Sequence, residues 1–153
     1  MALEGLSAKE RTETGKKGGV KKIVFLAGAV WPEGFQHGPL PFFDYKGDEM
    51  YCIDAAGLLF NDLAPDTAST WISKLRCQPS SGWDGVVDYV GWKDIPSVYL
   101  LCEQDALLSA EVQTQMADRA NSEIKTCDAG HCCMIGQPQR VLEVVEKAAG
   151  QVA

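Results

Sequence analysis

Two residues of this chain are of types that move protons in enzymes, and each follows an apolar run. Asp105 ends the run SVYLLCEQD, and His131 ends the run EIKTCDAGH. A carboxylate that is hydrogen-bonded to an imidazole fixes the tautomer of the ring and stabilises its protonated form. A histidine held in this way can act as a general base or a general acid. We therefore expect Asp105 and His131 to form a catalytic pair, with an inherited structural pair as the alternative.

No serine nucleophile accompanies this pair in the sequence. The G-x-S-x-G motif, which exposes a serine at a sharp strand-to-helix turn, is absent upstream of Asp105. Cys132 is a candidate substitute because a thiol beside an imidazole can be activated. Neighbours in sequence usually point in different directions, however, so packing is the favoured role of Cys132 and Cys133. A zinc site from Cys127, His131 and these thiols is disfavoured because paired C-x₂₋₄-C spacing is lacking. We expect neither a metal nor a cofactor.

An aromatic-rich segment separates the first apolar run of the chain from the second. Such a segment can line an apolar pocket for a small-molecule substrate, although its rings can equally form a small core of their own. His37 lies there in the loop GFQHGPLPFFDY, and an exposed position is the alternative to a substrate contact. Our candidate substrate-binding residues are Trp31, His37, Phe42, Phe43, Trp83 and Trp92.

The elements that must position these residues can be read from periodicity. Apolar runs predict buried strands at 21–30, 97–105 and 123–130. Helical patterns are found at 65–76, 109–120 and 137–150. Strands separated by helices predict parallel β-α-β units, whose carboxyl edge is where α/β proteins bind ligands. Asp105 and His131 would therefore meet at that edge.

The last two helical patterns also predict caps and buried faces. Ser109 is placed to cap the first helix, and Gly150 is placed to end the second. The side chains expected to face the sheet are Val112, Met116 and Ala120 in the first helix, and Val141, Leu142, Val145 and Ala148 in the second.

Length and composition set the class of protein. A chain of 153 residues predicts one α/β domain, 1–153, and its pattern of elements predicts a parallel sheet of about three strands, flanking helices and a long insertion at 31–94. The net charge of −7 argues against a nucleic-acid partner. No apolar stretch approaches the roughly 20 residues that cross a bilayer. The N-terminus lacks the pattern of a signal peptide, and the cysteines do not resemble a disulfide scaffold, so we expect a cytoplasmic protein with reduced thiols.

Several stretches of the chain resemble, in order and spacing, the C-terminal part of the α/β-hydrolase family. They are EGLSAKERTETGKKGGV, KKIVFLAGAVWPEG, LLFNDLAPDTASTWISKLRCQ, YVGWKDIPSVYLLCEQDALL and DAGHCCMIGQP. The nearest branch contains small, mostly fungal and bacterial hydrolases. The resemblance implies that Asp105 is the catalytic acid, His131 the catalytic base and 31–94 a lid-like insertion that covers the substrate. The family's first five strands, its nucleophile and its oxyanion-hole amides have no counterpart here.

The function expected from these observations is acid–base chemistry on a small, largely apolar molecule, without covalent ester hydrolysis. Elimination, isomerisation and cyclisation are reactions of this kind, and fungal secondary metabolism is a natural setting by analogy. Two alternatives stay open. One is hydrolysis with a nucleophile from a partner chain or from Cys132, and the other is a non-catalytic binding remnant.

The first predicted strand has a further consequence for assembly. Without a neighbouring nucleophile strand, residues 23–28 would form an open apolar edge, which proteins avoid. We expect a homodimer or a larger assembly, formed by edge pairing or by packing of exposed helix faces.

Overall fold

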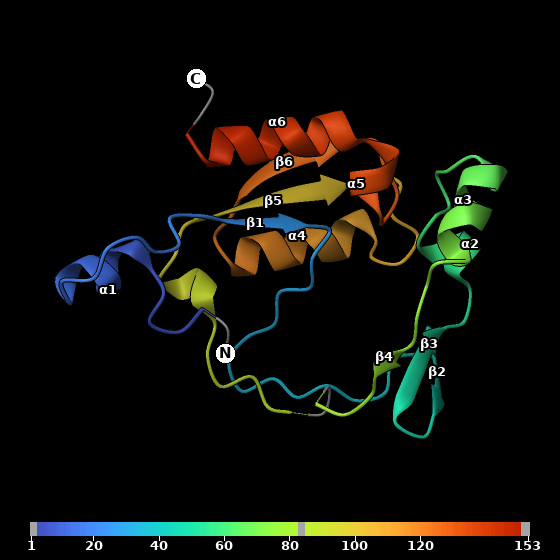
Figure 1. Cartoon of the computed structure of the whole chain (residues 1–153), viewed down its shortest axis with the longest axis horizontal. Helices are drawn as coiled ribbons and strands as arrows, with labels where there is room; N and C mark the ends of the chain where they lie inside the picture. Colours follow the sequence, from blue (N-terminus) through green and yellow to red (C-terminus); the bar gives the residue numbers. More distant parts are fainter. Residues whose placement is uncertain (1–2, 83–84, 151–153) are drawn as a thin grey trace.

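A parallel three-stranded sheet forms the centre of the computed structural model, which describes residues 3–82 and 85–150 (Figure 1). Its strands, in the order β1-β5-β6, are β1 (Ile23–Leu26), β5 (Ser97–Cys102) and β6 (Glu123–Cys127). Val98 of β5 lies opposite Val24 of β1 on one side and Glu123 of β6 on the other. The predicted α/β class and the three predicted strands are confirmed.

The other elements, in chain order, are the helices and short strands that surround this sheet. They are α1 (Ala8–Glu13), β2 (Phe43–Lys46), β3 (Glu49–Cys52), α2 (Ala55–Leu58), α3 (Pro65–Ile72), β4 (Gln78–Pro79), η1 (Gly91–Lys93), α4 (Ala110–Arg119), α5 (Cys133–Gly136) and α6 (Pro138–Ala148). Among the described residues, no helix is both long enough and apolar enough to cross a membrane.

Helices cover both faces of the parallel sheet because the side chains of a strand alternate between the two faces. Val98 and Leu100 of β5 face α6, whereas Tyr99 and Leu101 face α4. Every residue of β5 is buried, as expected for the central strand of a sheet covered on both sides. Figure 1 shows α6 above the sheet and α4 below it.

The predicted helix caps are present at both helices. The Ser109 side chain accepts a hydrogen bond from the Val112 N–H at 3.3 Å, which caps α4. Gly150 follows α6 with a φ of 73°, the left-handed conformation that commonly ends a helix.

The predicted buried face of α6 is partly wrong. Val144 is 3% exposed, and Val141 and Ala148 pack beside it, which gives a stripe at spacings of three and four residues. Leu142 and Val145 are 46% and 41% exposed instead. A helix with apolar side chains on two adjacent stripes can turn either one toward the sheet, and periodicity does not decide between them.

The described residues of the segment 31–94, between β1 and β5, form a second, smaller sheet, the short helices α2 and α3, and the 3-10 helix η1. The strands β2, β3 and β4 are antiparallel and lie in that order. A two-residue turn at Gly47 and Asp48 joins β2 to β3, and Gly47 has the positive φ of 63° that such turns require. The helix predicted at 65–76 begins at Pro65 but ends at Ile72. Figure 1 places α2 and α3 beyond the arrowheads of β1 and β5, at the carboxyl edge of the parallel sheet.

Candidate functional site

Asp105 lies in the loop that follows β5, and the loop is wrapped around its carboxylate. The Asp105 side chain is fully buried. Its Oδ1 accepts hydrogen bonds from the backbone N–H groups of Leu107 and Leu108, at 2.8 and 2.9 Å. A carboxylate that bonds the backbone two and three residues ahead fixes the local turn. The sequence therefore builds this turn around the acid itself.

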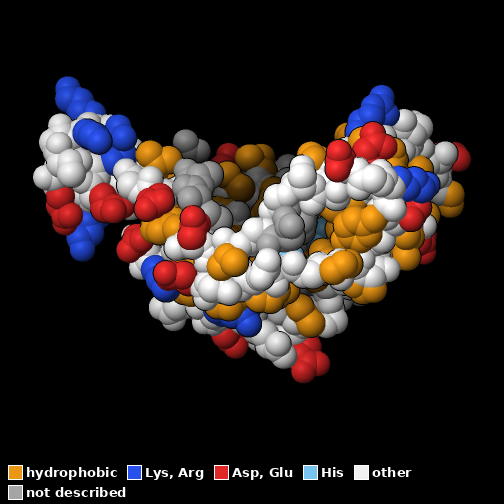
Figure 2. Space-filling model, turned by 90° about the horizontal axis from the view of Figure 1, so that it is seen from below, with side chains coloured by type: hydrophobic (Ala, Val, Ile, Leu, Met, Phe, Trp, Pro, Cys, Tyr) orange, Lys and Arg blue, Asp and Glu red, His pale blue; other side chains and the backbone are white. Residues whose placement is uncertain are grey.

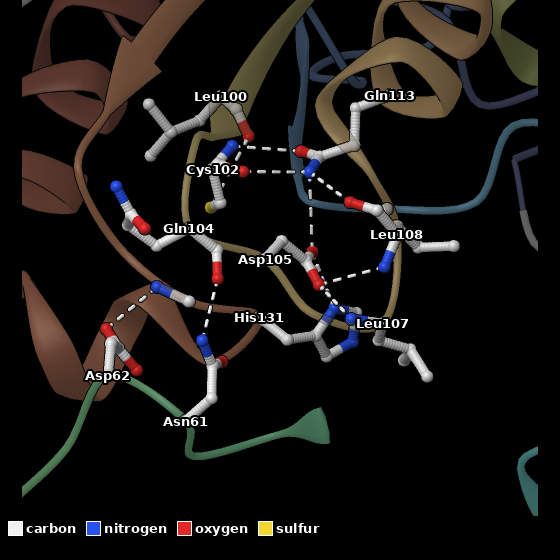
Figure 3. Close-up of polar contacts among 12 residues, drawn as sticks. Asn61, Asp62, Leu100, Cys102, Gln104, Asp105, Leu107, Leu108, Gln113 and His131 are labelled. Atoms are coloured by element: carbon white, nitrogen blue, oxygen red, sulfur yellow. Dashed lines mark hydrogen bonds and ion pairs between the residues drawn. The ribbon is translucent and has the colours of Figure 1, made fainter. Parts of the chain in front are cut away.

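Gln113 supports the same loop from α4. Its amide is fully buried, and Oε1 accepts a hydrogen bond from the Cys102 N–H at 2.9 Å. Its Nε2 donates to the carbonyl oxygens of Cys102 and Leu108, at 3.0 and 2.7 Å, and approaches Asp105 Oδ2 at 3.4 Å. One side chain thus ties the end of β5, the loop and the carboxylate together (Figure 3).

His131 completes the pair from the loop after β6. Its Nδ1 lies 2.9 Å from Asp105 Oδ2, so the structure brings together the two residues predicted to be catalytic. An ionised carboxylate only accepts hydrogen bonds, which makes His131 Nδ1–H the donor and leaves a lone pair on Nε2. The His131 side chain is 24% exposed and lines a cavity, so this lone pair can meet a bound molecule.

Asn61 and Asp62 attach the segment after α2 to both of these loops (Figure 3). Asn61 Nδ2 donates to the Gln104 carbonyl at 2.8 Å, next to Asp105. Asp62 Oδ2 accepts from the Gly130 N–H at 2.8 Å, next to His131. Each contact fixes the backbone beside one member of the pair. We call these two residues the loop clamp.

A cavity of about 530 Å³ lies at the carboxyl edge of the sheet, and His131 forms part of its wall. Four of the six predicted substrate-binding residues line it: Trp31, His37, Phe42 and Phe43. The Trp31 ring stacks on Phe35 with a centroid distance of 4.2 Å, and the His37 ring meets both rings edge-on at 4.9 Å. In Figure 2, hydrophobic side chains gather on the right of the view, around a recess in which pale-blue histidine atoms are visible.

One of the predicted substrate-binding residues, Trp92, is absent from the described wall of this cavity. Trp92 lies in η1, beside Ser97 and Asn121 at the amino edge of the sheet, where it packs against the core between β5 and α4. Trp92 precedes β5 and Asp105 follows β5, so the length of the strand separates Trp92 from Asp105. We therefore remove Trp92 from the candidate site. Trp83 lies outside the described residues.

The end of β1 contributes strained backbone to the cavity wall. Ala27 has a φ of 43°, in the left-handed region that residues with a side chain rarely adopt. Its N–H donates to the Leu100 carbonyl at 3.1 Å, and the Tyr99 hydroxyl donates to the next carbonyl, that of Gly28, at 2.9 Å. Such strain persists where surrounding contacts fix it, often at functional sites.

Three of the cysteines near His131 pack in the protein interior, and Cys132 is partly buried. Cys102, Cys127 and Cys133 belong to the core cluster between the sheet and α6, and packing is the role that we expect for Cys133 from the sequence. Cys132 is absent from the described residues that line the cavity. Burial raises the pKa of the Cys132 thiol to about 11. In the part of the chain that the structure describes, no three His, Cys, Asp or Glu side chains are grouped to hold a metal ion.

Cys132 is expected to resist alkylation in the folded protein at pH 8. A thiol whose pKa is raised to about 11 keeps its proton to higher pH. Only about one molecule in a thousand then carries the reactive thiolate at pH 8. Peptide mapping after iodoacetamide treatment should show labelling of Cys132 that rises as the pH approaches 11. The same residue should label readily at pH 8 in urea. Fast labelling of the native protein at pH 7 would restore Cys132 as a nucleophile candidate.

Sequence reasoning missed three residues that hold this site: Gln113, Asn61 and Asp62. Gln113 was detectable as a polar residue three positions before Met116, on the stripe of α4 that faces the sheet. Val112, predicted to be on that stripe, is 37% exposed and lines the cavity. Asn61 and Asp62 carry no comparable signal, because their partners are more than 40 residues away in the chain.

Known proteins resemble this chain in sequence or in fold. The chain is 33% identical over 96 residues to Alpha/beta hydrolase nvfD of Aspergillus novofumigatus (strain IBT 16806), covering 61% of this chain and 38% of that protein. It is 28% identical over 156 residues to Probable hydrolase R7 of Phoma sp. (strain ATCC 20986 / MF5453), covering 90% of this chain and 63% of that protein. The crystal structure of methylesterase protein MES16 from Arabidopsis matches with a TM-score of 0.71 at 13% identity, over 88% of this chain and 61% of that one.

This chain spans less than two thirds of the length of each of these three relatives. The likeness to the solved structure concerns the fold alone, given its low sequence identity. The match to the family itself extends over residues 2–144, which include both strands that carry the Asp105–His131 pair. The chain belongs to the alpha/beta hydrolase family.

Proposed function

We propose that this protein binds a small apolar molecule in the cavity and transfers a proton on it with His131, which Asp105 orients. The observation that carries the proposal is the 2.9 Å contact from His131 Nδ1 to Asp105 Oδ2. It fixes the tautomer that leaves Nε2 as a base, and Nε2 has no hydrogen-bond partner among the described residues. A general base needs only reach and the correct protonation state, and the ring already lines the cavity.

The proposed chemistry proceeds without a covalent intermediate. His131 Nε2 takes a proton from the substrate, and the electron pair of the broken bond forms a new double bond or ring. The imidazolium that results is stabilised by the buried Asp105 carboxylate. The imidazolium then returns its proton to a second atom of the substrate or to the leaving group. Isomerisation, cyclisation and elimination all fit this sequence. Two relatives come from Aspergillus and Phoma, which supports a fungal setting, and secondary metabolism is the kind of pathway that we propose there.

Hydrolysis is the second candidate function. It is supported by the names of the relatives, which are a hydrolase, a probable hydrolase and a methylesterase, each longer than this chain. His131 would then take its proton from a nucleophile that lies on another segment or on a partner chain. No serine or threonine is among the described residues that line the cavity, and the raised pKa of Cys132 disfavours that thiol.

Turnover by the variant His131→Gln tests the proposal. The purified protein is incubated with small-molecule extracts of its own organism, and mass spectrometry follows the compounds that are consumed and formed. Conversion by the variant at the wild-type rate would remove His131 from the mechanism. A fluorophosphonate probe distinguishes the two functions, because covalent labelling with loss of turnover supports hydrolysis and its absence supports proton transfer.

We also propose that the protein self-associates, through the edge of β1 or through α6. Among the described residues, β1 pairs only with β5, so its other edge is open. The apolar side chains of Leu142 and Val145 on α6 are both exposed. An open strand edge and an apolar helix face are each suited to a symmetric contact between two copies.

Sedimentation velocity at a protein concentration of about 10 µM is expected to show a dimer or a larger species. A dimer with a dissociation constant of about 1 mM, which corresponds to only about 4 kcal/mol of binding, would be dissociated at this concentration. The double variant Leu142→Glu, Val145→Glu identifies the contact, because a shift to monomer assigns it to α6 and an unchanged dimer assigns it to β1. A wild-type monomer would contradict the proposal.

A further inference from the structure

Arg76 gives the wall of the cavity its one permanent charge among the described residues. The other residues of that wall are apolar, aromatic or uncharged polar, apart from His37 and His131, and no aspartate or glutamate is among them. Asp105 lies behind His131 with its side chain fully buried. A guanidinium stays protonated at any physiological pH, so the described part of the wall carries a positive charge.

Backbone pairing holds the Arg76 segment against the cavity. Gln78 of β4 pairs with Met50 of β3, and Met50 is 1% exposed. Both of these residues line the cavity, as does Leu75, which directly precedes Arg76. Arg76 is exposed and lies in the chain between two residues of the wall, two positions before the paired residue Gln78.

The guanidinium has no acidic partner among the described residues. Its Nη1 donates to the carbonyl oxygens of Leu75 and Lys74, at 3.0 and 3.5 Å, and these are neutral acceptors on its own segment. Its Nε and Nη2 have no hydrogen-bond partner in the described structure. Arginine presents donors in a planar fork that matches a carboxylate in two parallel hydrogen bonds.

We propose that Arg76 binds a carboxylate of the ligand, so that the cavity takes an apolar acid. This inference rests on the proposed function, because it specifies the substrate class of the same cavity. The apolar body would lie against the rings of Trp31, Phe42 and Phe43, and the carboxylate would pair with Arg76. The net charge of −7 disfavours the approach of anions in general, so a local cation is needed to select one.

Binding of 2-naphthoate and of its neutral analogue 2-naphthamide tests this proposal by isothermal titration calorimetry. The wild type is expected to bind naphthoate about tenfold more tightly than naphthamide, which corresponds to about one charged hydrogen-bonded contact. Arg76→Gln should weaken naphthoate binding about tenfold and leave naphthamide binding unchanged. Arg76→Lys, which keeps the charge but not the fork, should recover part of the loss.

Lys74→Gln is the matched control, because it removes the same charge two residues away. Lys74 Nζ lies over the Trp71 ring, 4.6 Å from its centroid, and Lys74 is absent from the described cavity wall. This variant is expected to bind naphthoate like the wild type. An equal loss in Lys74→Gln, or no loss in Arg76→Gln, would overturn the role of Arg76. Naphthamide binding alone would then still support an apolar cavity. Failure of both compounds to bind the wild type would overturn the substrate class and the apolar cavity together.

Discussion

Replacing His131 with glutamine, or Asp105 with asparagine, is expected to lower turnover of the physiological substrate by about 10²- to 10⁴-fold. Glutamine at position 131 removes the imidazole that lines the cavity and is hydrogen-bonded to the buried Asp105 carboxylate. Asparagine at position 105 keeps the size and shape of the side chain. Its effect must therefore come from the loss of the negative charge, which stabilises the imidazolium, and from the change of one oxygen acceptor to an amide donor.

The hydrogen bonds of Asp105 determine which oxygen that change affects. Oδ1 accepts from the N–H groups of Leu107 and Leu108, which must keep an acceptor in the variant. The new NH₂ group therefore takes the place of Oδ2, where it faces His131 Nδ1 and Gln113 Nε2. A donor opposite Nδ1 favours the ring tautomer protonated at Nε2, and that tautomer has no lone pair toward the cavity. The new NH₂ group also faces the Gln113 Nε2 donor, and two donors cannot form a hydrogen bond with each other.

Nitrogen NMR of the imidazoles measures this switch without a known substrate. The chain has two histidines, so only two sets of ring signals occur. We expect His131 to be protonated at Nδ1 in the wild type and at Nε2 in Asp105→Asn. Asp94→Asn is the matched control, since Asp94 accepts a hydrogen bond from the Tyr89 hydroxyl at 2.9 Å and lies by the amino edge of the sheet. It should change neither the tautomer nor the rate. Full activity of both site variants would make this pair a structural remnant.

The Asp105–His131 pair could be predicted from sequence because sheet geometry brings the residues together. Each residue follows a buried strand, and the two strands are parallel neighbours, so both loops open at the same edge. The same rule shows why Trp92 was wrongly included. Trp92 precedes Ser97, the first residue of β5, which assigns it to the amino edge. Its place ahead of the strand is by itself enough to separate it from Asp105, which follows the strand.

The other features near the site differ in how well the sequence predicts them. The β2–β3 hairpin has a recognisable signal, because Gly47-Asp48 separates two short runs and Gly-Asp is a typical two-residue hairpin turn. The loop clamp has no such signal. Asn61 and Asp62 bond backbone atoms of Gln104 and Gly130, and contacts over such separations depend on how the segment 31–94 packs on the sheet.

Replacing Gly130 with alanine is expected to lower the free energy of unfolding by about 2 kcal/mol. A Cβ at this position would lie 2.5 Å from Asp62 Oδ1 and 2.6 Å from Asn61 Oδ1. Both clamp side chains are exposed and can rotate away, so the overlap itself is relieved. Rotation breaks the Asn61 bond to Gln104 and the Asp62 bond to Gly130, and it leaves the N–H of a buried residue without a partner.

Urea denaturation of four variants measures this loss and assigns it to the clamp. Gly38→Ala is the control glycine, because a Cβ there meets nothing within 4 Å, and its effect should stay within about 0.5 kcal/mol. Asp62→Ala removes the carboxylate alone. The double variant Gly130→Ala, Asp62→Ala should cost less than the sum of the two single changes, by on the order of 1 kcal/mol.

The non-additivity follows because each single change breaks the same hydrogen bond, which can be lost only once. Strictly additive costs would show that the alanine at 130 acts elsewhere, and the clamp would then not explain the glycine. Gly130 also directly precedes His131, so relaxation of its backbone should move the ring relative to Asp105. Turnover in Gly130→Ala is accordingly expected to fall further than stability alone accounts for, at temperatures where the variant is still folded. A stable variant with the wild-type rate would show that the clamp secures the fold without positioning His131.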